Sequence, residues 1–148
     1  MPPVTEEHLY TDHVHPWEEI VDYVSRNEVS KLRRNRYAQE VYQKWTSDTL
    51  VKYGTVENFL LKEKLHWPKD DPKPILVLPN DFPYSVDPGI EHVLIWSKEP
   101  LVDKTFIESL LDERYGATVW EWVYFVNPPE LQSIPTLPHM HVFMRKRI

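Results

Sequence analysis

The stretches that decide the fold are TVWEWVYFV at residues 118–126 and PHMHVFMRK at residues 138–146. In each stretch large apolar residues recur at every second position, and alternate residues of a β-strand point to opposite faces of a sheet. Both stretches are therefore predicted strands. On one face the second strand carries His139, His141, Phe143 and Arg145. Its other face carries the apolar residues Met140, Val142 and Met144, which are expected to pack in a core.

Residues 16–65 have the spacing of helices. Apolar residues recur at intervals of three and four in the first predicted helix and again along residues 38–49, which is the pattern of one buried helix face. Ser30 is predicted to cap the second helix and Gly54 to end it. Thr55 is predicted to cap a third, short helix. The N-terminal part of the chain is thus expected to be helical.

After the Pro-rich connector HWPKDDPKP the pattern changes. Short apolar runs at residues 75–78 and 92–96 predict strands, and Asp103 is predicted to cap a helix that presents Phe106 and its apolar neighbours to the core. The order of elements predicts an α+β fold with a small, mostly antiparallel sheet on which the N-terminal helices pack. Because the connector is short, we expect a single domain over residues 1–148.

The composition narrows the function classes. The chain has 148 residues, with 23 Asp and Glu against 17 Lys and Arg, and a formal net charge of -6. A general nucleic-acid binder presents a basic surface, so no nucleic-acid partner is expected. The absence of Cys excludes disulfides, thiolate catalysis and iron–sulfur clusters.

Two further expectations concern location and assembly. Residues 1–10 lack a charged region followed by an apolar run, so no secretory signal is expected. No apolar run approaches the roughly 20 residues that cross a bilayer. We expect a cytoplasmic protein, with the nucleus as a second location. Aromatic residues make up 13% of the chain and suit a homodimer interface as well as a core.

Two imidazoles on one strand face make a candidate phosphate site. His139 and His141 are two positions apart, and Arg145 follows on the same face as a candidate phosphate-binding side chain. A neutral imidazole can attack phosphorus while a second histidine orients or protonates the reacting group. Two other interpretations stay open: the histidines are polar residues on an exposed face, or they bind a metal together with His92. We assign no metal ligand and expect no cofactor.

Two other polar groups are candidates for ligand contacts. Asn80 and Asp81 open an irregular, turn-rich segment and could hydrogen-bond sugar hydroxyls, or could simply close a tight turn. The basic cluster at residues 26–36 could hold phosphate, but a solvated helix face paired with nearby acids is the favoured interpretation. Whether it contacts a ligand or a partner stays open. His13 and His15 are interpreted as surface or helix-entry residues.

Four long segments carry a resemblance over most of residues 16–148. They are PNDFPY at residues 79–84, DPGIEHVLIWSK at residues 87–98, FVNPPELQSIP at residues 125–135 and PHMHVFMRK at residues 138–146. With these segments the chain resembles the fungal N-acetylglucosamine-induced protein 1 family, whose domain has no known function. This resemblance implies no particular chemistry.

A more remote pattern covers residues 75–146. An Asn-x-x-Pro segment at residues 80–83 precedes Pro88-Gly89, and Gln132-Ser133 precedes the final histidine strand. In this order the segments resemble the histidine-triad and galactose-1-phosphate uridylyltransferase superfamily. The resemblance implies a histidine-triad-like sheet and a nucleotide or nucleotide-sugar ligand. Phe143 stands where the superfamily has a third histidine, which the uridylyltransferase branch also lacks.

The resemblance also implies residue roles. His141 would be the nucleophile that attacks the α-phosphate, and His139 would support it. Three further positions are implied to contact the ligand: Asn80, Asp81 and Ser133. The expected function is a nucleotide or nucleotide-sugar binding protein that acts as a nucleotidyl transferase or hydrolase. The alternatives are a non-catalytic nucleotide-sensing module and a metal-dependent enzyme with a His-x-His site.

Overall fold

The structure is a computed structural model that describes residues 10–127 and 137–148. It divides into two compact units. The first unit comprises Met1–His66 and Asn80–Asp87, and the second comprises Trp67–Pro79 and Pro88–Ile148. No helix among the described residues is long and apolar enough to cross a membrane. The single domain expected from the sequence stays a prediction.

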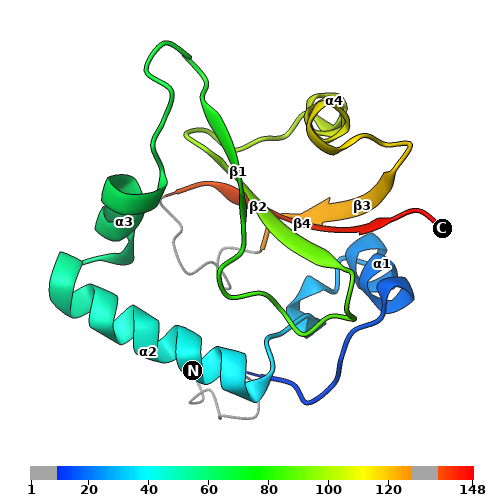
Figure 1. The fold of residues 1–148 in the computed structure, drawn as a ribbon, viewed down its shortest axis with the longest axis horizontal. Coiled ribbons are helices and arrows are strands. Elements are labelled where there is room, and N and C mark those ends of the chain that lie inside the picture. Colours follow the sequence, from blue (N-terminus) through cyan, green and yellow to red (C-terminus); the bar gives the residue numbers. More distant parts are fainter. Residues whose placement is uncertain (1–9, 128–136) are drawn as a thin grey trace. The chain divides into compact units, whose positions relative to one another are not determined.

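The second unit is built on a four-stranded sheet (Figure 1). Its strands are β1 (Ile75–Pro79), β2 (Glu91–Ser97), β3 (Trp120–Phe125) and β4 (His139–Lys146). They lie in the order β1-β2-β4-β3, and every neighbouring pair is antiparallel. The predicted α+β class and antiparallel sheet are therefore confirmed.

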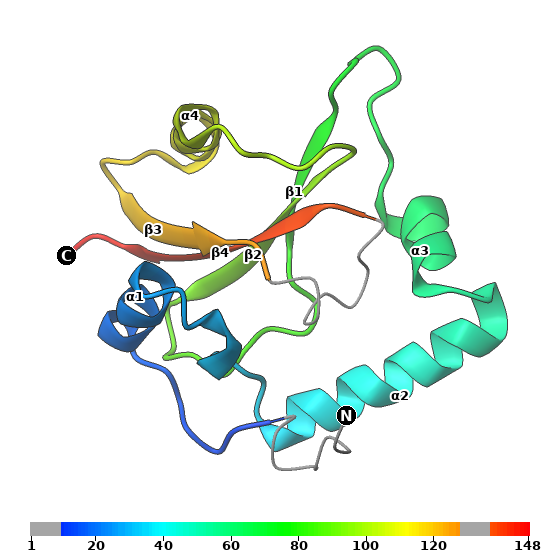
Figure 2. The ribbon, with the colours of Figure 1, turned by 180° about the vertical axis from the view of Figure 1, so that it is seen from behind.

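One face of the sheet packs against helix α4 (Lys104–Tyr115), which both ribbon views show alongside the strands (Figures 1 and 2). The shared core holds Ile107 and Leu111 of α4 with buried apolar residues of three strands: Val77, Val93, Ile95, Met140, Val142 and Met144. The predicted cap is confirmed, because Asp103 Oδ1 accepts from the backbone N–H of Thr105 at 3.0 Å. The inward position predicted for Phe106 is wrong. It is 45% exposed, because it lies about 100° around the helix from Ile107.

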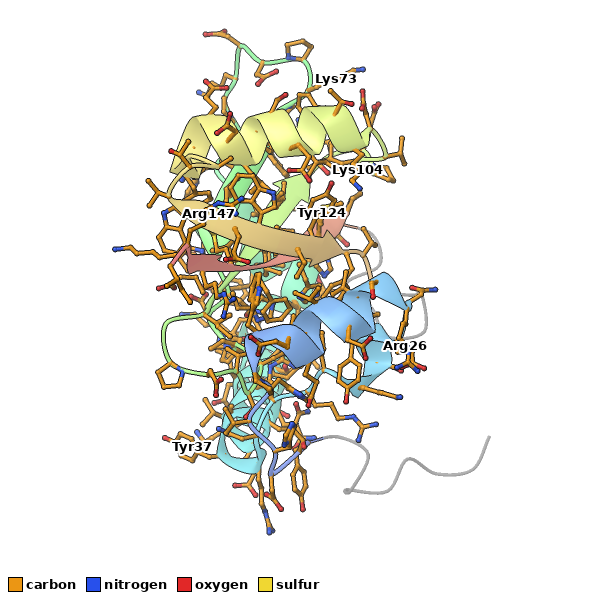
Figure 3. The ribbon with its side chains drawn as sticks, turned by 90° about the vertical axis from the view of Figure 1, so that its right-hand side faces the viewer. Arg26, Tyr37, Lys73, Lys104, Tyr124 and Arg147 are labelled. Carbon is orange, nitrogen blue, oxygen red and sulfur yellow. The ribbon has the colours of Figure 1, made fainter. Side chains whose placement is uncertain are left out.

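The carboxylate of Glu108 ties β3 to α4. It accepts from the indole N–H of Trp122 at 2.7 Å and from the hydroxyl of Tyr124 at 3.1 Å. Tyr124 projects from β3 on the side of α4 (Figure 3). Burial, helped by the hydrogen bond and the charge of Glu108, raises the pKa of Tyr124 to about 12. The phenol therefore stays a hydrogen-bond donor well beyond neutral pH.

The first unit is helical, as predicted. It contains α1 (Trp17–Ser25), a 3₁₀ turn (Val29–Lys31), α2 (Arg36–Tyr53), α3 (Val56–Phe59) and a π-helical turn (Leu60–Lys64), which follow one another along the chain (Figure 2). Gly54 at φ +83° ends α2, and Thr55 caps α3, both as predicted. The prediction of Ser30 as the cap of α2 is wrong: Asn35 holds that position and accepts from Ala38 N–H at 2.8 Å.

Candidate functional site

The sheet presents its histidines on the face opposite α4. Because Met140, Val142 and Met144 pack in the α4 core, the strand's alternation turns His139 and His141 to the other face, as predicted. His92, on the neighbouring strand β2, shares that face, since its Nε2 lies 2.9 Å from Nδ1 of His141. We call His92, His139 and His141 the histidine face.

His141 is buried, and both of its ring nitrogens are hydrogen-bonded. Its Nε2 lies 3.1 Å from Nδ2 of Asn127, and its ring stacks on Phe125 at 5.2 Å. An amide nitrogen can only donate, so Nε2 of His141 accepts and the proton of the neutral ring sits on Nδ1. That Nδ1–H then donates to Nε2 of His92. The lone pair of His141 Nε2 therefore accepts the hydrogen bond from the Asn127 amide.

His139 differs from His141 in its bonding. Its Nδ1 donates to the carbonyl of Leu137 at 2.9 Å, and its ring lies against Trp96 with centroids 4.7 Å apart. Burial lowers the pKa of His139, and the weaker opposing effect of the Leu137 hydrogen bond does not restore it. The ring is therefore neutral at pH 7 and, with the proton on Nδ1, carries its lone pair on Nε2.

A cavity of about 150 Å³ opens beside His139. Its walls come from β2, β4 and the segments around them: Ile95, Ser97, Pro100, Leu101, Val126, Pro138 and Met140. A second cavity of about 450 Å³ shares Ser97, Pro100 and Leu101 with the first and extends to Lys73, Lys98 and Phe106. His139 thus lines the smaller of two adjoining cavities of the second unit, and Ile95 and Met140 bring residues of the α4 face to the same cavity.

The lowered pKa of His139 predicts a pH effect on stability. A histidine whose folded pKa lies below its ordinary value of 6.5 binds a proton more readily in the unfolded chain, so stability falls as pH drops through 6.5 towards the folded pKa. We expect His139→Gln to reduce this fall. Denaturant unfolding at pH 7.5 and pH 5.5 measures it, and an equal pH dependence in wild type and variant would contradict the assignment.

The other predicted site residues have partners of their own. Arg145 lies opposite Glu121 on β3, with Nε and Oε2 3.6 Å apart. Asn80 Oδ1 accepts from Phe82 N–H at 2.8 Å, which closes a turn, and Asp81 pairs with Lys64 at 2.9 Å. Both of these belong to the first unit. Ser133 lies outside the described residues.

The basic cluster is largely paired with acids in the first unit. Arg26 lies 3.1 Å from Asp22, Lys31 lies 3.0 Å from Glu28, and a third pair joins Arg36 to Glu40 at 3.2 Å. These pairs favour the interpretation of the cluster as a solvated surface rather than as a phosphate site.

The sequence interpretation missed a group at the start of α1. His15 is 2% exposed and directly precedes Pro16, the N-cap of α1, so the helix-entry interpretation is right and the surface interpretation is wrong. With His13 and Glu19 it forms a group of three whose potential metal-ligating atoms all lie within 4.8 Å of one another. Among the described residues no such group is formed by His92, His139 and His141. The His-x-His spacing and the four-residue step from His15 to Glu19 were the available signals.

Comparison with known proteins identifies relatives but no activity. The chain is 29% identical to the uncharacterized protein YPL067C of Saccharomyces cerevisiae over 158 aligned positions, covering 86% of this chain and 77% of the relative. It is 26% identical to N-acetylglucosamine-induced protein 1 of Candida albicans, covering 87% of this chain and 67% of that protein, which confirms the fungal resemblance.

The chain is also similar to a solved structure. The crystal structure of HTC1 matches with a TM-score of 0.58 and 27% identity, covering 88% of this chain and 84% of that one. A family model described as a protein of unknown function (DUF3605) matches residues 16–145. With its sheet, its helices and nearly its whole length inside that match, the chain belongs to the DUF3605 family.

Proposed function

We propose that this protein binds a nucleotide or nucleotide sugar at the histidine face and the recess beside it. The observation that carries the proposal is the neutral His139, which is one of the residues that line the smaller cavity, together with Ile95 and Met140 of the α4 face. A neutral imidazole nitrogen can accept a hydrogen bond from a sugar or base, or react with phosphorus. The larger adjoining cavity, of about 450 Å³, lies within the roughly 300–1,000 Å³ of small-molecule sites.

The histidine-triad resemblance belongs to this proposal. An antiparallel sheet with a helix between its second and third strands, and with the His-x-His pair on its last strand, is compatible with it. In the catalytic version, the lone pair of His141 Nε2 attacks the α-phosphorus. A P–N bond forms, and the leaving phosphate or sugar-phosphate oxygen departs with the bonding electrons. Water or an acceptor phosphate then breaks the P–N bond, which regenerates the imidazole.

The hydrogen bonds of His141 set a condition for the catalytic version of the proposal. Its Nε2 accepts from Asn127, and its ring is 5% exposed. Attack on phosphorus therefore requires Asn127 to release Nε2 as the ligand binds. His139 meets no such condition, because its Nε2 has no hydrogen-bond partner among the described residues. Of the two rings, His139 is the better placed for direct ligand contact.

A non-catalytic nucleotide-sensing module is the second candidate. The observation that favours it is the engagement of both nitrogens of His141, by His92 and Asn127. A buried, fully hydrogen-bonded imidazole stabilises the sheet, as buried polar groups normally do when they are satisfied. In this version Arg145, on the same face of β4, contributes a contact rather than chemistry.

Thermal unfolding of the full chain with a panel of nucleoside phosphates and nucleotide sugars tests the proposal. A ligand at 100 times its dissociation constant should stabilise the protein by about 2.7 kcal/mol, and His139→Gln should weaken that shift. Inorganic phosphate is the control. If no member of the panel raises the melting temperature more than inorganic phosphate does, the proposal is wrong.

A measurement of ligand turnover distinguishes the enzyme from the non-catalytic sensing module. If phosphorus-31 NMR detects product from a ligand that binds, His141→Asn should lower its rate by several orders of magnitude, because positioning alone cannot replace a lost covalent step. Circular dichroism of the variant checks that the sheet is intact. Binding without product supports the sensing module, and unchanged turnover in a folded His141→Asn protein rules out His141 as nucleophile.

A further inference from the structure

We propose that His13, His15 and Glu19 form a binding site for a divalent transition-metal ion of the Zn²⁺ class. The three side chains meet where the chain enters α1. Glu19 Oε2 lies 2.9 Å from Nε2 of His13, and Glu19 Oε1 lies 2.6 Å from Nδ1 of His15. The site lies wholly within the first unit and does not depend on the proposed nucleotide function.

The backbone holds both imidazoles in place before any ion binds. His15 N–H donates to the Ser85 carbonyl at 2.9 Å, and Asp87 N–H donates to the His15 carbonyl at 3.1 Å. The hydroxyl of Ser85 donates to the carbonyl of His13 at 2.9 Å. Residues from a distant part of the sequence thus fix the segment that carries the two histidines. Glu19 is fixed separately, because it lies in the first turn of α1.

The type and number of ligands fit a borderline divalent ion. Two imidazole nitrogens and one carboxylate are the protein ligands of zinc sites that keep a fourth position for water or another ligand. Hard ions such as Mg²⁺ and Ca²⁺ prefer oxygen ligands throughout and should bind weakly here. Each histidine contacts one oxygen of the carboxylate, and the potential ligand atoms of all three residues lie within 4.8 Å of one another.

The distances between the two imidazoles and Glu19 are hydrogen-bond distances, which are shorter than the spacing of ligand atoms around a bound ion. Ligand atoms around a tetrahedral Zn²⁺ lie about 3.3 Å apart when each bond is about 2.0–2.1 Å. The imidazole–carboxylate separations of 2.6 and 2.9 Å would widen by roughly 0.4–0.7 Å to reach this spacing. The two imidazole nitrogens, which lie within 4.8 Å of each other, would have to reach the same spacing. Coordination would replace the two imidazole–carboxylate hydrogen bonds, and each neutral ring would then carry its proton on its other nitrogen, Nδ1 of His13 and Nε2 of His15.

The burial of the three side chains determines which nitrogen of His15 can bind the ion and from which side the ion can enter. His15 Nε2 is buried and has no hydrogen-bond partner among the described residues, so only Nδ1 faces the group. The side chains of His13 and Glu19 are 55% and 24% exposed, which leaves one side open to solvent. An ion can enter from that side and retain water as its fourth ligand.

Equilibrium dialysis against Zn²⁺ tests the site in the full chain, purified without a histidine tag and stripped with chelator. We expect one Zn²⁺ per chain and a higher melting temperature with Zn²⁺ but not with Mg²⁺. His13→Ala and Glu19→Gln should each weaken binding more than tenfold, since even the loss of a supporting hydrogen bond costs about 10–100-fold. His66→Ala, which removes an exposed histidine elsewhere, should leave binding unchanged.

Three results would overturn the proposal. The first is an absence of bound Zn²⁺ in the wild-type chain. The second is undiminished binding in both His13→Ala and Glu19→Gln, whose exposed or half-exposed side chains can be replaced without disturbing a core. The third is loss of binding in His139→Ala instead, which would place the ion on the histidine face. The first two results leave the nucleotide proposal untouched, so the two proposals can fail separately.

Discussion

Replacing Phe143 by alanine should destabilise the protein by about 3–5 kcal/mol, the usual cost of removing a buried phenylalanine ring. Phe143 has no exposed surface. Its ring stacks on His92 at 4.2 Å and lies 6.0 Å from the ring of Phe125. The variant therefore loses both the transfer free energy of the ring and the contacts of the atoms that surround the new cavity.

Denaturant unfolding measures this loss as a lower midpoint with an unchanged slope. Phe106→Ala is the matched control, because it removes the same ring from a position that is 45% exposed, and it should cost under about 1 kcal/mol. Phe143→Leu keeps most of the volume and should fall between the two. Equal losses in Phe143→Ala and Phe106→Ala would show that Phe143 does not anchor the sheet.

The parts of the fold that were predicted correctly depend on local pattern. The alternation of β4 and the caps at Asp103 and Thr55 use information within a few residues of each position. The prediction of Ser30 as a cap failed because distant pairing overrides local preference. The carbonyls of Arg33 and Arg34 accept from Ser85 N–H and Thr11 N–H, both at 2.9 Å. These bonds accompany an extended backbone after Val29–Lys31, so α2 begins only after Asn35.

In the candidate site, too, the features set by local pattern were predicted and those set by distant pairing were not. Alternation alone predicted that His139 and His141 share a face. The contacts of His141 with His92 and Asn127 depend on the register of β2 and β4, which pairs Leu94 with His141. No local pattern in the sequence specifies that register. For the same reason the group around Glu19 was missed, since the bridge that holds His15 pairs it with Val86.

The second large effect is expected at Arg34, in the first unit. Its Nε donates to the carbonyl of Phe82 at 2.7 Å, and its guanidinium carbon lies 4.1 Å from the ring centroid of Tyr42 and 5.3 Å from that of Tyr84. Burial lowers the pKa of Arg34, but an arginine remains charged at neutral pH. One cation thus joins α2 to the turn that contains Phe82.

Arg34→Met should cost about 2–4 kcal/mol. A hydrogen bond from a charged donor contributes about 1.5–3 kcal/mol, and cation–π contact adds about 0.5–2 kcal/mol, while the methionine stem recovers part of the apolar packing. Arg34→Lys should recover little, because an ammonium group lacks the planar fork that donates to Phe82 while stacking on Tyr42.

Arg36→Ala is the matched control: Arg36 is exposed and pairs with exposed Glu40, so its loss should cost under about 1 kcal/mol. If chemical denaturation gives Arg34→Met and Arg36→Ala the same midpoint, Arg34 is a surface charge, and the segment around Phe82 is held by its aromatic contacts alone.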